Sequence, residues 1–412
     1  MNTPAQRLRA TTILLPEPPD LLAQAGEDGL LFREENGGLA GRGQALRIDL
    51  PGLWDTDAVA EASAVLAEIE TDDPVGRPGT GPVAIGALPF DPTAPGHLIV
   101  PRRIFGRDGD VGWLTTVEPY DAGPSPVDVG PDPVAPADPP DEFRLTPTMT
   151  HADWKDVIAA AVETLDRGDL DKVVLARRID IEGNRPFVVS DVLERLAALY
   201  PSCMVYSVEG FLGASPELLI RRHGDQIVSH PLAGTVARSG DAHGDELLVA
   251  RLMESTKIRH EHRLVVDAIA ASLEPLSESL SVPETPSVLG LRNVSHLATH
   301  ITGRLGRERP SALELAARLH PTPAVGGAPT EAARHYMQKV EGFDRGRYAG
   351  PVGWIDGRGD GCFALGIRCA QVSGDHASLY AGNGIVRGSD PADELAETQL
   401  KLQALLAALV RP

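Results

Sequence analysis

Two ionisable side chains stand where apolar stretches of the sequence begin. Lys172 precedes Val173, Val174 and Leu175 in DKVVLARR, and desolvation among them could leave it a neutral amine near neutral pH. Glu217 follows a Ser-Pro turn in GASPELLI, where burial would raise its pKa and keep a proton available for donation. Such a pair could act as general base and general acid. A solvated charge at a strand end is the simpler interpretation of each residue, and the local sequence leaves both open.

A second group of residues could bind a cation. Glu261 stands between His260 and His262 in RHEHRLVV. On a helix these histidines point about 200° apart, so the pair cannot hold one zinc ion. Glu261 could still be one metal ligand.

The C-terminal segment DELAETQLK places Glu394, Glu397 and Lys401 on one face of a predicted helix. An ordinary surface ion pair would show the same spacing. The preceding AGNGIVRGSDP resembles a ligand-cradling turn that leads into a helix N-terminus. Because it is not a G-x-G-x-x-G sequence and the chain has no Walker A motif, nucleotide binding has little support.

Composition restricts the partners that these residues could serve. The chain has 412 residues, and 38 basic against 58 acidic side chains give a net charge of −20. Long-range repulsion therefore argues against nucleic acid and anionic membranes, and an anionic ligand needs a local positive site. Three scattered cysteines indicate neither a disulfide framework nor a zinc site, so we expect a cytoplasmic protein. We also expect neither secretion nor a membrane span, because a leader pattern and an 18-residue apolar run are both missing.

The elements that must position these residues fall into two regions. Residues 1–145 end in a Pro- and Asp-rich connector within residues 119–147. Before it, the patterns predict a helix from Asp55 to Glu70 and strands in LRIDLPGLW, PVAIGALPF and HLIVPRRIFG.

Residues 146–412 are better patterned. Thr150 and Ser190 are predicted helix caps, and a long helical pattern runs from about Asp245 to Leu273. Two shorter helices are predicted within residues 310–342, and DPADELAETQLKLQALLAALV predicts a C-terminal helix. Strands are predicted at 171–182, 203–209, 217–223 and 226–230, and in VGWID, CFALGIRCAQV and ASLYAGNGIV. Hairpin-linked strands beside separate helices indicate a mostly antiparallel α+β fold.

The motifs follow a familiar order along the chain. They are KVVLAR, GASPELLI, HPLAGT, RHEHRLV, LHPTPAVGG, YAGPVGW, IRCA, YAGNGIV and SDPADELAETQLK. In this order the chain resembles the chorismate-utilising enzymes, and among them most closely the isochorismate synthases. The resemblance covers residues 146–412 densely and residues 1–145 only in length and general character. It implies one large α+β unit of two packed antiparallel sheets flanked by helices, with Mg²⁺ as cofactor and chorismate as substrate.

The reaction that the resemblance implies adds water at C2 of the ring, shifts the double bonds and releases the C4 hydroxyl. Lys172 matches the family's base that activates water, and Glu217 matches the acid that protonates the leaving hydroxyl. Glu261 and Glu397 look like direct or water-bridged Mg²⁺ ligands, with Glu394 as a supporting carboxylate. Hard oxygen ligands suit this hard cation.

The resemblance also implies how a dianion would be held. Arg368 in IRCA and Lys401 look like anchors for the carboxylates of chorismate, assisted by backbone N–H groups near Gly382 and Gly384. The same motif matches imply further substrate-binding positions at Gly234, Thr235, His320 and Tyr348.

Relatives on the same scaffold catalyse other reactions. Anthranilate synthases generally lack the water-activating lysine, which Lys172 supplies here, and aminodeoxychorismate synthases carry a lysine in P-I-K-G-T where this chain has Ala233. Salicylate synthases keep both the base and the acid and further eliminate pyruvate, so they stay as the alternative. LHPTPAVGG favours isochorismate synthase. Asn383 departs from the small residue expected in many relatives and leaves substrate orientation near the glycines open.

A non-catalytic relative that only binds chorismate is a further alternative. Its sequence would have lost Lys172, Glu217 or a metal carboxylate, and none is lost. Because an enzyme that uses water needs no ammonia channel, we expect no glutamine amidotransferase subunit, and we expect a monomer. The sequence leaves open whether the product feeds menaquinone or siderophore synthesis.

Overall fold

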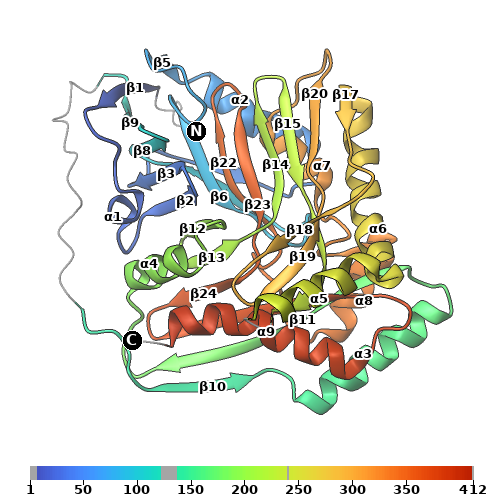
Figure 1. Ribbon diagram of the computed structural model, residues 1–412. Helices are drawn as coiled ribbons and strands as arrows, with labels where there is room; N and C mark the ends of the chain where they lie inside the picture. Colours follow the sequence, from blue (N-terminus) through green and yellow to red (C-terminus); the bar gives the residue numbers. More distant parts are fainter. Residues whose placement is uncertain (1–6, 122–136, 239–240, 411–412) are drawn as a thin grey trace.

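The computed structural model describes residues 7–121, 137–238 and 241–410, so residues 122–136 of the predicted connector lie outside it. Within these ranges the strands form a 13-stranded, a 9-stranded and a 3-stranded sheet. Helices flank the sheets. In Figure 1 the 13-stranded sheet extends from the bottom of the molecule to its upper left, and the 9-stranded sheet lies in the upper centre and right. Adjacent strands are predominantly antiparallel. The predicted α+β fold of two antiparallel sheets flanked by helices is confirmed.

The 13-stranded sheet carries the predicted base at the start of one of its strands. In spatial order it contains β10 (Phe143–Pro147), β11 (Lys172–Gly183), β25 (His376–Ile385), β24 (Cys369–Ser373), β13 (Phe211–Ser215), β12 (Met204–Val208), β2 (Leu30–Glu34), β3 (Gly37–Arg42), β8 (Arg103–Asp108), β9 (Val111–Pro119), β1 (Leu8–Leu15) and β5 (Glu70–Asp72). The short strand β21 (Gly327–Ala328) pairs with β11 outside this path.

The other two sheets contain nine and three strands. The larger contains, in spatial order, β17 (Ser277–Ser281), β20 (Ile301–Leu305), β15 (Gln226–His230), β14 (Leu218–His223), β23 (Gly361–Leu365), β22 (Pro351–Asp356), β6 (Val83–Ala87), β7 (Gly96–Val100) and β4 (Leu46–Leu50). The smaller contains β16 (Leu232–Ala237), β19 (Val294–Ala298) and β18 (Ser287–Gly290).

Several of the helices begin at local capping signals. Thr150 and Asp153 form a capping box at one helix, and Ser311 and Glu314 form another. The helices are α1 (Leu21–Ala25), α2 (Thr56–Ala67), α3 (His151–Asp166), α4 (Val189–Leu199), α5 (Ala242–Glu254), α6 (Thr256–Leu273), the 3₁₀ turn η1 (Glu274–Leu276), α7 (Ala312–Leu319), α8 (Thr330–Val340) and α9 (Pro391–Leu409).

Two predicted helix boundaries are wrong. The pattern from Asp245 to Leu273 is two helices, because Ser255 leaves the helical conformation and its hydroxyl accepts a hydrogen bond from the Ile258 amide. Ser190 does not cap α4. It lies inside the first turn, where the carboxylate of Glu27 accepts from its amide and hydroxyl. A carboxylate from a distant segment thus replaces the expected local cap.

The two sequence regions share both large sheets. β2 pairs with β12, and β6 pairs with β22 over five residues. One hydrophobic core cluster joins Phe32 and Ile85 of the first region to Val352 and Phe363 of the second. Each of the two large sheets therefore contains strands from residues 1–145 and strands from residues 146–412.

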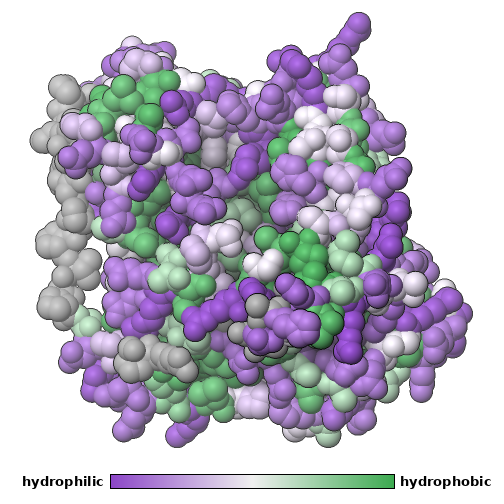
Figure 2. All heavy atoms as spheres, viewed as in Figure 1, coloured by the Kyte–Doolittle hydropathy of each residue, from purple (hydrophilic) through white to green (hydrophobic). Residues whose placement is uncertain are grey.

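The surface is consistent with the acidic composition. Figure 2 shows hydrophilic side chains over most of the visible face, with apolar side chains gathered in smaller areas between them. In the described ranges, none of the helices combines the length and apolar character that crossing a bilayer demands.

A fragment of residues 146–412 is expected not to fold alone, because it would expose the edges of β12 and β22 and part of the common core. The measurement compares the thermal unfolding of the fragment with that of the whole chain by circular dichroism. Co-expression with residues 1–145 serves as the control. A cooperative transition of the lone fragment at the temperature of the whole chain would contradict the prediction.

Candidate active site

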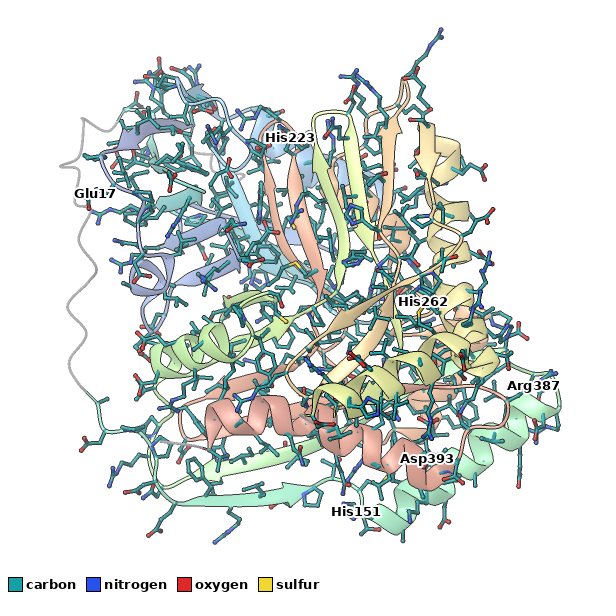
Figure 3. The ribbon with its side chains drawn as sticks, in the orientation of Figure 1. Glu17, His151, His223, His262, Arg387 and Asp393 are labelled. Carbon is teal, nitrogen blue, oxygen red and sulfur yellow. The ribbon has the colours of Figure 1, made fainter. Side chains whose placement is uncertain are left out.

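A pocket of about 660 Å³, part of it open to solvent, lies where β11, β25, β16 and β19 meet α6 and α9. In Figure 3 the labelled His262 and Asp393 mark α6 and α9, the helices that carry its carboxylates. The structure brings ten of the residues predicted for the site to this pocket: Glu217, Gly234, Thr235, Glu261, Tyr348, Arg368, Gly382, Gly384, Glu397 and Lys401. Lys172, Glu394 and His320 do not line it.

Lys172 lies directly behind the pocket wall at the start of β11. Its side chain is fully buried, and its Nζ is 3.1 Å from Oε1 of Glu261. The lysine is thus not the solvated strand-end charge of the simpler interpretation. Gly384 of the adjacent β25 permits this approach, since a Cβ there would lie 2.3 Å from Glu261 Oε1 and 2.7 Å from Lys172 Cε.

Glu217 is buried at the start of β14. Its Oε1 accepts a hydrogen bond from the Leu232 amide at 3.3 Å. Burial raises the pKa of this carboxyl group to about 7, although the Leu232 hydrogen bond and the charge of Lys172 oppose the shift. The pocket therefore contains an acid that keeps its proton at a pH where an exposed glutamate has lost it.

Arg368 reaches the pocket through an unusual backbone conformation. Its φ is 51°, a left-handed value that is rare for a residue with a side chain, and its carbonyl accepts from the Ala214 amide at 3.1 Å. Its Nη2 is 3.2 Å from Nε2 of His296. The guanidinium is thereby oriented before any ligand arrives.

Sequence reasoning missed His296. Its Nδ1 is 3.2 Å from the Gly234 carbonyl, which can only accept, so Nδ1 carries the hydrogen and Nε2 accepts from Arg368. Burial and the charge of Arg368 hold the pKa of His296 well below its usual value. A histidine inside the apolar strand NVSHLA was the signal that could have found it.

Glu397 and Glu261, the carboxylates that line the pocket from the two helices, each face a nearby basic side chain. Glu397 Oε1 is 2.7 Å from Lys401 Nζ, which also donates to the Gly382 carbonyl at 2.8 Å. Lys172 contacts Glu261 as described above. In the described part of the chain, no group of three or more His, Cys, Asp or Glu side chains is arranged to hold a metal ion.

Glu394 lies beneath the pocket floor rather than in its lining. Asn383 Nδ2 donates to the Glu394 carboxylate and, at 2.9 Å, to its backbone carbonyl. Lys257 Nζ lies 3.7 Å from the same carboxylate. Burial, and next the charge of Glu397, raise the pKa of Glu394 to about 7. Asn383, the unusual residue of AGNG, therefore connects β25, the strand of Gly382 and Gly384, to α9.

His320 is not part of the pocket, so the sequence prediction for this residue is corrected. Its Nε2 is 2.8 Å from the Phe90 carbonyl, and its ring packs edge-on against Phe90. Its own carbonyl accepts from Trp54 Nε1 at 3.3 Å. His320 instead anchors the LHPTPAVGG loop to residues 1–145, and Ala324 and Val325 are the members of that motif that line the pocket.

The chain is similar to known proteins in both sequence and structure, and several of these proteins are isochorismate synthases. A family model described as chorismate binding enzyme matches residues 132–410. Isochorismate synthase DhbC of Bacillus subtilis is 37% identical over 339 residues, which are 80% of this chain and 81% of that protein. Isochorismate synthase EntC of Escherichia coli K12 is 36% identical over 332 residues, covering 79% of this chain and 80% of that protein.

A solved structure extends the similarity to nearly the whole chain. MenF, the menaquinone-specific isochorismate synthase from Escherichia coli, superposes with a TM-score of 0.81 at 27% identity and covers 98% of this chain and 95% of its own. The family match spans more than half of the chain, and the relatives share more than 30% identity over most of it. On this evidence the chain belongs to the family of chorismate binding enzymes.

Proposed function

We propose that this protein is an isochorismate synthase that adds water at C2 of chorismate and releases the C4 hydroxyl. One observation carries the proposal. The buried Lys172 and the buried, proton-retaining Glu217 lie at one pocket, which is also lined by two cationic side chains, those of Arg368 and Lys401. The names of the relatives DhbC, EntC and MenF support the same reaction.

Lys172 and Glu217 take opposite parts in the proton transfers. Lys172, as a neutral amine, accepts the proton of the attacking water, and Glu217 gives its proton to the departing hydroxyl. Both side chains are enclosed by protein, so bulk water has little access to the transferred protons. The raised pKa of Glu217 supports its part as the proton donor, and the buried position of Lys172 beside the pocket supports its part as the base.

Arg368 and Lys401 give a dianion its positive contacts in a chain of net charge −20. The guanidinium of Arg368 can bind a carboxylate in the bidentate manner, while Lys401 offers a point charge at the glycine strand. His296 holds Arg368 in place, which reduces the ordering that substrate binding must impose.

The donor chemistry of the pocket fits magnesium. Glu261 and Glu397 line the pocket from α6 and α9, and Glu394 lies one helical turn from Glu397. Carboxylate oxygens are the ligands that this cation prefers, and it commonly binds through one or two of them together with its ligand's own oxygens. When bound, Mg²⁺ would supply positive charge to the ring carboxylate of the substrate. Because water is the nucleophile, the enzyme needs no amidotransferase subunit to supply ammonia. We also infer that it acts in the cytoplasm and as a monomer.

The product identifies the reaction. Purified protein with chorismate and Mg²⁺ is expected to give isochorismate as the main product on chromatography, and a chelator is expected to abolish the conversion. Boiled protein is the control. Salicylate with released pyruvate would instead identify a salicylate synthase, and binding without any product would identify a non-catalytic protein.

Loss of either proton-transfer group should remove turnover while the fold persists. Lys172→Ala and Glu217→Gln are each expected to lower kcat by about 10²–10⁴-fold, the usual contribution of general acid–base catalysis. Lys155→Ala and Glu163→Gln, at exposed positions of α3, are the matched controls and should keep full turnover. Near-normal kcat in either site variant would refute the role of that residue.

The pH dependence follows from Glu217. The acid is competent only when protonated, and burial raises its pKa to about 7, so kcat should decline above about pH 7 by about tenfold per pH unit. The measurement is kcat at saturating chorismate from pH 6 to 9, with the unfolding temperature recorded at each pH to show that the fold is intact. A flat profile over this range would exclude Glu217 as the acid.

A further inference from the structure

The edge of β11 has a gap in its strand pairing. β25 pairs with one edge of β11 from Val173 to Glu182. On the other edge, β21 pairs only with Lys172 and Val173, and β10 pairs only from Ile179 onward. No strand of the described chain pairs with residues 174–178 on that edge. The Val174 amide donates to the Gly326 carbonyl at 2.7 Å, and the Arg178 carbonyl accepts from the Thr148 amide at 3.1 Å. Between them, the Val174 carbonyl and the Ala176 amide still need partners.

An ion pair between α8 and the following loop fills this gap. Arg345 Nη2 donates to the Val174 carbonyl at 2.7 Å, and Glu341 Oε1 accepts from the Ala176 amide at 2.9 Å. The same guanidinium donates through Nη1 to the Val325 carbonyl at 2.8 Å and through Nε to Glu341 Oε2 at 2.8 Å. The two side chains thus offer β11 the donor and the acceptor that a neighbouring strand would have offered.

The Arg345–Glu341 pair is buried, and its donors and acceptors nearly all have hydrogen-bond partners. Both side chains are 4% exposed, and the guanidinium lies 4.3 Å from the ring centroid of Phe90. Removing one partner would leave an uncompensated buried charge. A lysine in place of Arg345 could not reproduce the planar fork that reaches a carboxylate and two carbonyls at once.

The groups that the pair holds belong to the active site. Val174 and Val325 line the pocket on separate segments, and Lys172 lies two residues before Val174 on the same strand. We propose that Glu341 and Arg345 form a positioning unit that holds β11 to the loop of Val325 and thereby sets the placement of Lys172 and the width of the substrate pocket. This inference rests on the proposed function only for the identity of the substrate and of the reaction.

Hydrogen exchange tests the positioning without reference to activity. In Arg345→Lys and in Glu341→Gln, backbone amides of residues 172–178 and 322–327 are expected to exchange at least about tenfold faster, because the ion pair that orders the hydrogen bonds at the gap is broken or weakened. The control is Arg195→Lys. Arg195 also pairs with an acid four residues earlier, Asp191, and donates to the Ala408 carbonyl at 3.0 Å, but it does not line the pocket. Unchanged exchange in both segments would overturn the proposal.

Steady-state kinetics with chorismate tests the consequence for the site. Arg345→Lys is expected to lower kcat/KM by about 100-fold, with a loss in kcat as well as a rise in KM, since displacement of a reacting group by about 1 Å costs this much. Assays run at least 15 °C below the measured unfolding temperature of the variant. A variant that unfolds at a lower temperature but keeps kcat and KM would show an ordinary core ion pair and overturn the proposal.

Chemical rescue separates positioning from a general loss of folding. A cavity lined by Phe90, Glu341, Phe343 and Arg345 is partly open to solvent and shares no lining residue with the substrate pocket, so a small cation can reach the vacated place in Arg345→Ala. Guanidinium at up to about 50 mM is expected to restore at least about tenfold in kcat/KM, whereas methylammonium, which lacks the planar fork, should not. Equal effects of the two cations would count against the proposal.

The outcomes also separate this inference from the proposed function. If the wild-type protein does not convert chorismate, the proposed function fails, and the exchange measurements still decide whether the pair holds the two segments. If the wild type converts chorismate and the Arg345 and Glu341 variants do so equally well, the positioning unit fails and the proposed function stands.

Discussion

The active site depends on keeping buried charges paired. Lys172 faces Glu261, Lys401 faces Glu397, and Arg368 meets the neutral acceptor His296. A buried ion without a partner would cost several kcal/mol, so Lys401 is held by Glu397 and Arg368 by the acceptor nitrogen of His296 in the absence of a ligand. A substrate carboxylate must therefore compete with Glu397 and His296 for these cationic side chains. Binding exchanges one set of contacts for another and does not fill an empty positive site.

Sequence reasoning located most of the pocket because its residues stand at element boundaries. Lys172 begins a strand, Glu217 immediately precedes one, and Glu397 and Lys401 share a helix face, so the local sequence allowed a chemical role as one of two interpretations. The roles themselves, and positions such as Arg368 and Tyr348, were predicted from the resemblance to the chorismate-utilising enzymes. The antiparallel α+β class followed from hairpin spacing in the same way. His296 was missed because its only local signal is a single histidine within an apolar strand, and its role depends on Arg368, 72 residues away.

The errors have the same origin in distant contacts. His320 was assigned to the pocket from its motif, but Phe90 and Trp54, more than 200 residues away, draw it to the N-terminal region. The cap expected at Ser190 is displaced by Glu27, and the gap in β11 is closed by residues of α8 and its following loop. Each case requires the register between segments far apart in the chain, which hydrophobic periodicity does not encode.

The sharing of sheets between the two ends of the chain affects its synthesis. β6 finds its partner β22 only when residues 351–356 leave the ribosome, because Val83 pairs with Asp356. At about 5–20 residues per second, the nascent chain must carry an uncovered apolar strand edge for roughly 14–55 s. A neighbouring nascent chain could pair with that edge during this interval, and a slower ribosome lengthens it.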